Sequence, residues 1–155
     1  MIKVIYHIAD VHIRLFKRHE EYQDVINQFY KEVIGDMEKR KLKREEVRIA
    51  IAGDLVHSKN QMTPELVSFV IKMLNDCTRI CKTVIILGNH DFLANNLDRM
   101  DALSPLIESL DNEDILFYKD TGCYKDNNIV WCVYSQVTGS DRPKIEKSKE
   151  KYPNK

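Results

Sequence analysis

Three short polar segments of the chain carry the side chains that proteins use to bind divalent metal ions. Each directly follows an apolar stretch: Asp10-Val11-His12 follows the first, Gly53-Asp54 the second, and Gly88-Asn89-His90-Asp91 the third. Carboxylates, imidazoles and an amide oxygen together suit manganese, iron or zinc, whereas an all-oxygen set would suit magnesium or calcium better. Two such ions about 3.5–4 Å apart can hold the attacking and the leaving oxygen during displacement at phosphorus. The residue types therefore predict a metal centre that cleaves phosphoesters.

The apolar stretches before these segments are predicted to be strands of one parallel sheet. Residues 2–9 alternate in polarity, Val47–Ala52 is apolar, and Thr83–Leu87 is a continuous apolar run, as in a strand covered on both faces. Apolar side chains recur at helical spacing over Tyr22–Met37, and Thr63-Pro64-Glu65 is a typical helix start. Alternating strands and helices favour right-handed crossovers, so the carboxyl ends of the strands meet at one edge of the sheet. We therefore expect the three polar segments to meet there.

The rest of the chain is predicted to be shorter elements and a polar tail. A helical region is expected around Asp98–Leu110, with a fresh turn at Ser104-Pro105. Short strands are expected at three places, the last two joined by a turn at Asp126–Asn128: Ile115–Tyr118, Gly122–Lys125 and Ile129–Ser135. From Gly139 onward the chain is polar and rich in lysine.

The composition is typical of a single domain that has no membrane span and no signal peptide. The 155 residues suit one domain, and 24 basic against 24 acidic side chains leave a net charge of zero. Affinity for nucleic acid must then come from local basic patches or from a metal site. No apolar run approaches the ~18 residues of a membrane span, and the N-terminus does not resemble a signal peptide. The four cysteines form no dense framework, which favours reduced thiols and a cytoplasmic location.

The polar segments also resemble a known family. Asp10-Val11-His12, Gly53-Asp54-Leu55-Val56-His57 and Gly88-Asn89-His90-Asp91 are similar to the first three motifs of the calcineurin-like metallophosphoesterases. The Gly-Asp-Leu-Val-His form looks most like the DNA-repair exonuclease branch, the SbcD-like nucleases and their phage or viral counterparts. The resemblance covers residues 2–135 and implies an α/β fold. It would be the N-terminal part of a four-layer α/β/β/α sandwich, with a mainly parallel first sheet followed by short antiparallel strands.

The resemblance implies a two-metal centre with particular ligands. Asp10 and His12 would bind the first ion, Asp54 would bridge both ions, and Asn89 would bind the second. The resemblance implies two divalent ions, for which manganese is the preferred assignment and iron or zinc are the alternatives. A metal-bound hydroxide would be the nucleophile.

The resemblance also implies roles for side chains around the metals. His90 would be the general acid that protonates the leaving oxygen, and Asp91 would orient its ring. His57 matches a further histidine of the exonuclease branch and would lie near the substrate phosphate. Arg14 and Arg18 follow the first motif and are candidates for contacts with substrate phosphates.

One departure from the family pattern affects the expected activity. The family's second half supplies three more histidines, and this chain has none after His90. We therefore expect residues 1–140 to be the N-terminal part of a nuclease domain, and residues 141–155 to lead into a missing C-terminal portion. The isolated chain should be weak or inactive, because lost ligands lower metal affinity.

Three functions are compatible with these observations. The first is a DNA exonuclease or endonuclease of repair and recombination, whose partners would be DNA, an SMC-like ATPase and a second copy of the chain. It would act in the cytoplasm, or in the nucleus or a viral factory. The second is a phosphatase or phosphodiesterase acting on nucleotides or phosphoproteins, because fold alone does not select the substrate. The third is a non-catalytic fragment that binds DNA or a partner through the same surface.

Overall fold

The centre of the molecule is a parallel sheet, as the alternation of strands and helices predicts. The computed structural model describes residues 1–14, 18–60, 62–92 and 99–138. Its four-stranded sheet has the order β1-β2-β3-β4, with every neighbouring pair parallel. The strands are β1 (Val4–Ile8), β2 (Val47–Ala52), β3 (Lys82–Ile86) and β4 (Ile115–Phe117). The predicted α/β class and parallel sheet are therefore confirmed.

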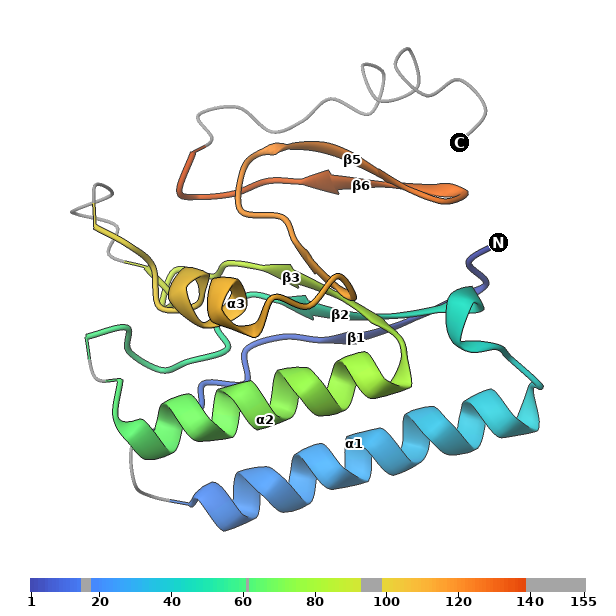
Figure 1. Ribbon diagram of the computed structural model, residues 1–155, viewed down its shortest axis with the longest axis horizontal. Helices are drawn as coiled ribbons and strands as arrows, with labels where there is room; N and C mark the ends of the chain where they lie inside the picture. The colour runs from blue at the N-terminus through green and yellow to red at the C-terminus, as the bar shows by residue number, and fades with distance from the viewer. Residues whose placement is uncertain (15–17, 61, 93–98, 139–155) are drawn as a thin grey trace.

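Two long helices cover one face of this sheet (Figure 1). Helix α1 (His19–Lys39) connects β1 to β2 through a short 3₁₀ turn, η1 (Arg44–Glu46), and α2 (Pro64–Ile80) connects β2 to β3. The predicted start of α2 is confirmed, because the Thr63 hydroxyl accepts a hydrogen bond from the Leu66 amide at 3.3 Å. The two helices are also tied together, since the buried Tyr30 hydroxyl donates to the Met73 carbonyl at 3.1 Å.

A two-stranded antiparallel sheet lies on the other side of the parallel sheet (Figure 1). It consists of β5 (Gly122–Asp126) and β6 (Ile129–Val133), joined by the predicted turn. A bidentate ion pair connects the two sheets: the Arg48 guanidinium of β2 donates to both Asp126 carboxylate oxygens, each at 2.8 Å. Arg48 is only 4% exposed. Because a buried charge needs a partner, this pair fixes the hairpin over β2.

Helix α3 (Ser104–Leu110) begins at Ser104-Pro105, as predicted, but the helical region is shorter than predicted. The helical region expected from Asp98 does not include residues 99–103, while residue 98 lies outside the described residues. The reason is the buried Asp101 carboxylate, which accepts hydrogen bonds from the Leu103 and Ser104 amides at 2.9 and 2.7 Å. A carboxylate that binds these donors starts a helix rather than continuing one.

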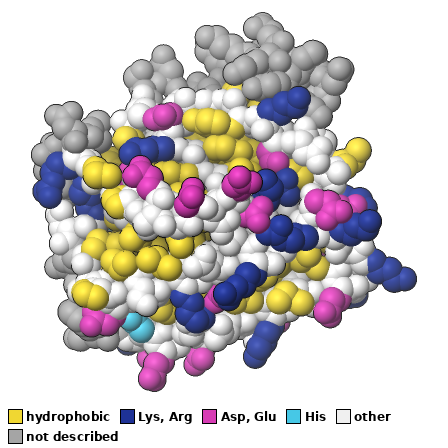
Figure 2. Space-filling model, viewed as in Figure 1, with side chains coloured by type: hydrophobic (Ala, Val, Ile, Leu, Met, Phe, Trp, Pro, Cys, Tyr) yellow, Lys and Arg dark blue, Asp and Glu magenta, His cyan; other side chains and the backbone are white. Residues whose placement is uncertain are grey.

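Two further predictions concern a membrane span and the boundary between the domain and its tail. None of the helices described here is both long enough and apolar enough to span a membrane. The boundary predicted between residues 1–140 and the tail at 141–155 falls at residues that the structure does not describe, so it stays a prediction. On the face shown in Figure 2, basic and acidic side chains are interspersed, in keeping with the net charge of zero.

Candidate metal centre

The three polar segments meet at one edge of the parallel sheet. The strands before them end level with one another. The last residue of β1, Ile8, pairs with Ile51 of β2, and the last residue of β2, Ala52, pairs with Ile86 at the end of β3. The contact continues beyond the strands, because the Asp10 amide donates to the Gly53 carbonyl at 3.2 Å. Residues far apart in sequence are thus brought together at the carboxyl ends of the strands, as predicted.

The segments after β1 and β2 continue side by side as far as His57. The His12 amide donates to the Asp54 carbonyl at 2.9 Å, and the His57 amide donates to the Ile13 carbonyl at 3.0 Å. Ile13 and Val56 form an isolated parallel bridge. These backbone contacts place His57 beside His12.

Unusual backbone angles orient three of the candidate metal ligands. Asp10, His12 and Asp54 all have positive φ angles, of 54°, 50° and 52°. Non-glycine residues rarely adopt this left-handed conformation, and strain of this kind concentrates at functional sites. Gly53, with φ of 83°, makes the turn that precedes Asp54.

The segment after β3 packs directly against Asp54. A Cβ atom at Gly88 would lie 2.1 Å from Asp54 Oδ1 and 2.2 Å from the Asp54 amide nitrogen, so only glycine fits. The close approach lets the His90 amide donate to Asp54 Oδ1 at 2.8 Å. Asp54 is therefore held by the third segment while its second oxygen, Oδ2, faces His12 at 3.8 Å.

One group of donors fits a divalent metal ion. Ligand atoms of Asp10, His12 and Asp54 all lie within 4.8 Å of one another. His12 Nε2 is 3.8 Å from an oxygen of each carboxylate, which is too long for a hydrogen bond but is a separation that an ion about 2.1 Å from each donor can bridge. Two carboxylates and an imidazole form a donor set suited to manganese, iron or zinc.

The three histidines of the segments form a second group of donors. Ring nitrogens of His12, His57 and His90 also lie within 4.8 Å of one another. The rings of His57 and His90 stack, with centroids 5.6 Å apart, and His12 meets His90 edge-on at 4.6 Å. Burial first, and then the nearby Arg14 guanidinium, lower the pKa of His57 below its ordinary value, which favours the neutral ring.

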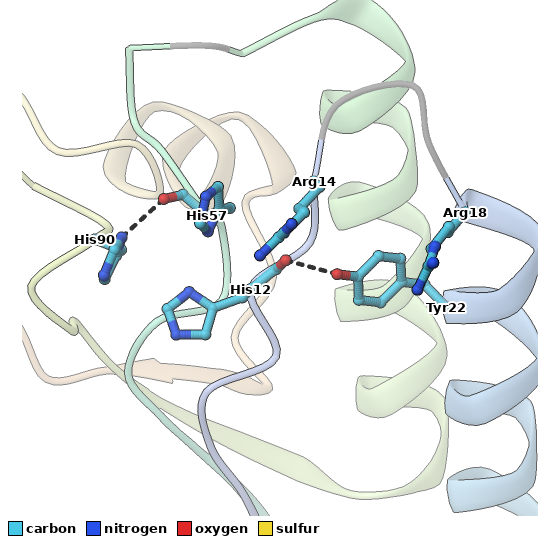
Figure 3. Close-up of a pocket in the computed structure, with 6 residues that line it drawn as sticks. All are labelled: His12, Arg14, Arg18, Tyr22, His57 and His90. Atoms are coloured by element: carbon cyan, nitrogen blue, oxygen red, sulfur yellow. Dashed lines mark hydrogen bonds between the residues drawn. The ribbon is translucent and has the colours of Figure 1, made fainter.

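A cavity of about 620 Å³ opens over these histidines (Figure 3). Its lining consists of His12, Arg14, Arg18, Tyr22, His57 and His90. Arg14 and Arg18 therefore line the same cavity as the three histidines, and their predicted contacts with substrate phosphates stay a prediction. Tyr22 was predicted only as part of the apolar face of its helix. Its hydroxyl donates to the His12 carbonyl at 2.8 Å, a role that only the packing of α1 against the first segment creates.

Asp91 does not contact the residue that it was predicted to orient. Nδ1 of His90 lies 2.8 Å from the His57 carbonyl oxygen. The Asp91 carboxylate is instead fully buried and accepts hydrogen bonds from the Gly88 and Val56 amides at 2.9 and 3.1 Å. Burial raises the pKa of Asp91. The predicted contact with His90 is therefore wrong, and Asp91 joins the second segment to the third.

Asn89 lies in the turn after β3 and is exposed. Its assignment as a ligand of the second ion stays a prediction.

Comparison with known proteins bears on this arrangement. The family model described as calcineurin-like phosphoesterase matches residues 3–153. The chain is also 37% identical over 160 residues to the uncharacterized protein R555 of Acanthamoeba polyphaga mimivirus. The alignment covers 99% of this chain and 12% of that protein, so the chain spans about an eighth of the relative's length.

Proposed function

The chain belongs to the calcineurin-like phosphoesterase family, and on that premise we propose that it hydrolyses phosphodiester bonds in DNA. The family match implies a general activity, metal-dependent hydrolysis of phosphoesters, without naming the substrate. The preference for DNA is supported by one observation: Arg14 and Arg18 line the cavity over the metal-binding residues. Arginine forms bidentate contacts with phosphate, so these side chains would hold a phosphate of the same strand next to the one being cleaved.

Three side chains would hold the first metal ion. Asp10, His12 and Asp54 offer donors within 4.8 Å of one another, and we propose that Asp54 and Asn89 share a second ion. Such ions supply an activated water molecule and neutralise charge on the phosphate. We propose manganese for both ions, with iron or zinc as alternatives, because the donors mix nitrogen with oxygen.

We propose that His90 protonates the leaving oxygen. Its Nδ1 lies 2.8 Å from the His57 carbonyl, which can accept only, so Nδ1 carries a proton. This contact orients the ring and leaves Nε2 for the substrate. In its protonated form, Nε2 would donate its proton to the oxygen that departs from phosphorus.

A nucleotide-directed phosphoesterase is the second candidate. A mainly apolar cavity of about 470 Å³ adjoins the first and shares Arg18 and Tyr22 with it. It also includes Asp10, so a nucleobase could occupy it while a phosphate reaches the metals.

If DNA is the substrate, we propose that the chain works with an SMC-like ATPase and with a second copy of itself. This assembly would act in the cytoplasm, in the nucleus or in a viral factory.

The substrate proposal can be tested by comparing three phosphoesters. With manganese, the purified chain should degrade end-labelled linear DNA only weakly, because no histidine follows His90 to complete the metal ligands. Asp54→Ala should abolish this residual activity, while His7→Ala, at an exposed position on β1, should not. Bis-p-nitrophenyl phosphate tests the chemistry without a DNA backbone, and a phosphopeptide tests a protein substrate.

Changing the arginines then isolates the DNA contact. The double variant Arg14→Ala, Arg18→Ala should lose far more activity on DNA than on bis-p-nitrophenyl phosphate. Equal losses on both substrates, or faster hydrolysis of the phosphopeptide than of DNA, would rule out the DNA preference.

A further inference from the structure

We propose that His12, His57 and His90 form a site for a zinc-type ion, which shares His12 with the carboxylate-containing group but adds His57 and His90. One ring nitrogen from each lies within 4.8 Å of the others. The three rings come from three different loops, after β1, β2 and β3, and line the same cavity (Figure 3). This site does not depend on the proposed hydrolysis of DNA, because it rests on the geometry of the imidazoles alone.

The hydrogen bond at Nδ1 of His90 fixes the tautomer that leaves Nε2 free to bind a metal ion. Histidines that bind metals commonly donate their other ring N–H to a carboxylate or a backbone carbonyl, which fixes the tautomer. His90 Nδ1 lies 2.8 Å from the His57 carbonyl oxygen, and this contact leaves the lone pair on Nε2. The second loop thus orients the ligand that the third loop supplies.

The other two rings have buried nitrogens without partners. Nδ1 of His12 and Nδ1 of His57 are buried and make no hydrogen bond within the described part of the chain. Buried polar atoms are nearly always paired in folded proteins, so each such atom calls for an explanation. A metal ion would pair with an unprotonated nitrogen of this kind.

The ligand chemistry separates this site from the neighbouring one. Three neutral imidazoles without a carboxylate favour zinc, copper or nickel over manganese. Three protein ligands with one open position are also the usual arrangement of a reactive zinc site. The open position would face the cavity, where Arg14 and Arg18 would hold an anion beside the ion.

Occupation of this site would have a consequence for His90. An ion on His90 Nε2 occupies the atom that the proposed function assigns to the leaving oxygen. Zinc bound by the three histidines would therefore compete with substrate, whereas manganese at Asp10 and Asp54 would not. His12 belongs to both groups, with Nε2 facing the two carboxylates at 3.8 Å.

The test is a zinc titration of the chelator-stripped chain, followed by long-range nitrogen-15 NMR of the five imidazoles. We expect the ring signals of His12, His57 and His90 to shift, and those of His7 and His19 to stay in place. Rings of His57 and His90 that do not respond at saturating zinc would overturn the proposal, and this measurement needs no variant.

A variant pair then measures the affinity. His57→Ala should weaken zinc binding in calorimetry by more than the roughly 10–100-fold that loss of an outer-shell partner costs, while His7→Ala should bind as the parent chain does. His57→Gln serves as a second variant if His57→Ala is unfolded by circular dichroism. A folded His57 variant that binds zinc with the parent affinity would contradict the proposal.

Discussion

The Nδ1 atom of His90 lies 2.8 Å from the carbonyl oxygen of His57, so a backbone group of the second segment orients the ring of the third. The neighbouring carboxylate, Asp91, is buried and accepts hydrogen bonds from backbone amides of the same two segments. The orientation of His90 thus depends on how the two loops pack, and Asp91 contributes by holding them together.

Replacing Asp91 should destabilise the fold. Asp91→Ala removes the acceptor for the Gly88 and Val56 amides, and unsatisfied buried donors cost about 1–3 kcal/mol each. We expect the free energy of unfolding in urea to fall by about 2–6 kcal/mol. Asp91→Asn, which keeps one acceptor oxygen, should lose less. An unchanged midpoint for Asp91→Ala would show that Asp91 does not join the loops.

Alanine at two glycine positions should be harmful at one and favourable at the other. Gly88→Ala would place a Cβ atom 2.1 Å from Asp54 Oδ1, so it should displace Asp54 and weaken manganese binding. Gly35→Ala, in the interior of α1, meets nothing within 4 Å and should stabilise the chain by about 0.5–1 kcal/mol. Thermal melts and calorimetry with manganese would compare the two variants. Parent-like metal affinity in Gly88→Ala would contradict the close packing described above.

The buried ion pair between Arg48 and Asp126 should be costly to break from one side. Arg48→Met leaves the Asp126 carboxylate buried without its partner, and such changes cost about 3–5 kcal/mol. Replacing both partners, as in Arg48→Met with Asp126→Leu, should recover much of that loss. Urea unfolding followed by the fluorescence of Trp131, whose ring N–H donates to Asp126 at 3.2 Å, measures the effect. Additive losses in the double variant would contradict the coupling.

The buried thiols should be inert near neutral pH and should lower stability in alkali. Burial raises the pKa of Cys77 to about 12 and that of Cys81 to about 11. The folded chain holds these protons more tightly than the unfolded chain does, where a thiol has a pKa of ~8.5. Their contribution to stability is therefore complete below that value and is lost as the pH rises toward 11–12.

A thiol reagent provides the measurement. At pH 8 the exposed Cys132 should react quickly, whereas Cys77 and Cys81 should react only after denaturation. Conservative variants at these two positions, Cys77→Ala and Cys81→Ala, should flatten the alkaline decline in stability. Rapid labelling of either buried thiol in the folded chain would refute the assignment.

The sequence by itself determined the parallel sheet, the position of the three polar segments that carry the candidate metal ligands, and the start of α2. These features follow from local patterns: apolar periodicity defines a strand or helix, Thr63-Pro64 caps a helix, and parallel strands must end at a common edge. The same local logic correctly predicted the start of α3 at Ser104-Pro105 but wrongly extended the helical region over residues 99–103, because the Asp101 carboxylate acts on amides whose positions depend on the surrounding packing.

Only the tertiary structure decided which atoms meet at that common edge. The left-handed φ angles of Asp10 and Asp54 aim their side chains, and the backbone pairing beyond β1 and β2 places His57 beside His12. A sequence motif states which side chains are available in a loop. Which neighbour each side chain contacts depends on long-range contacts between loops that are distant in the chain, and these form only when the sheet and its helices pack together.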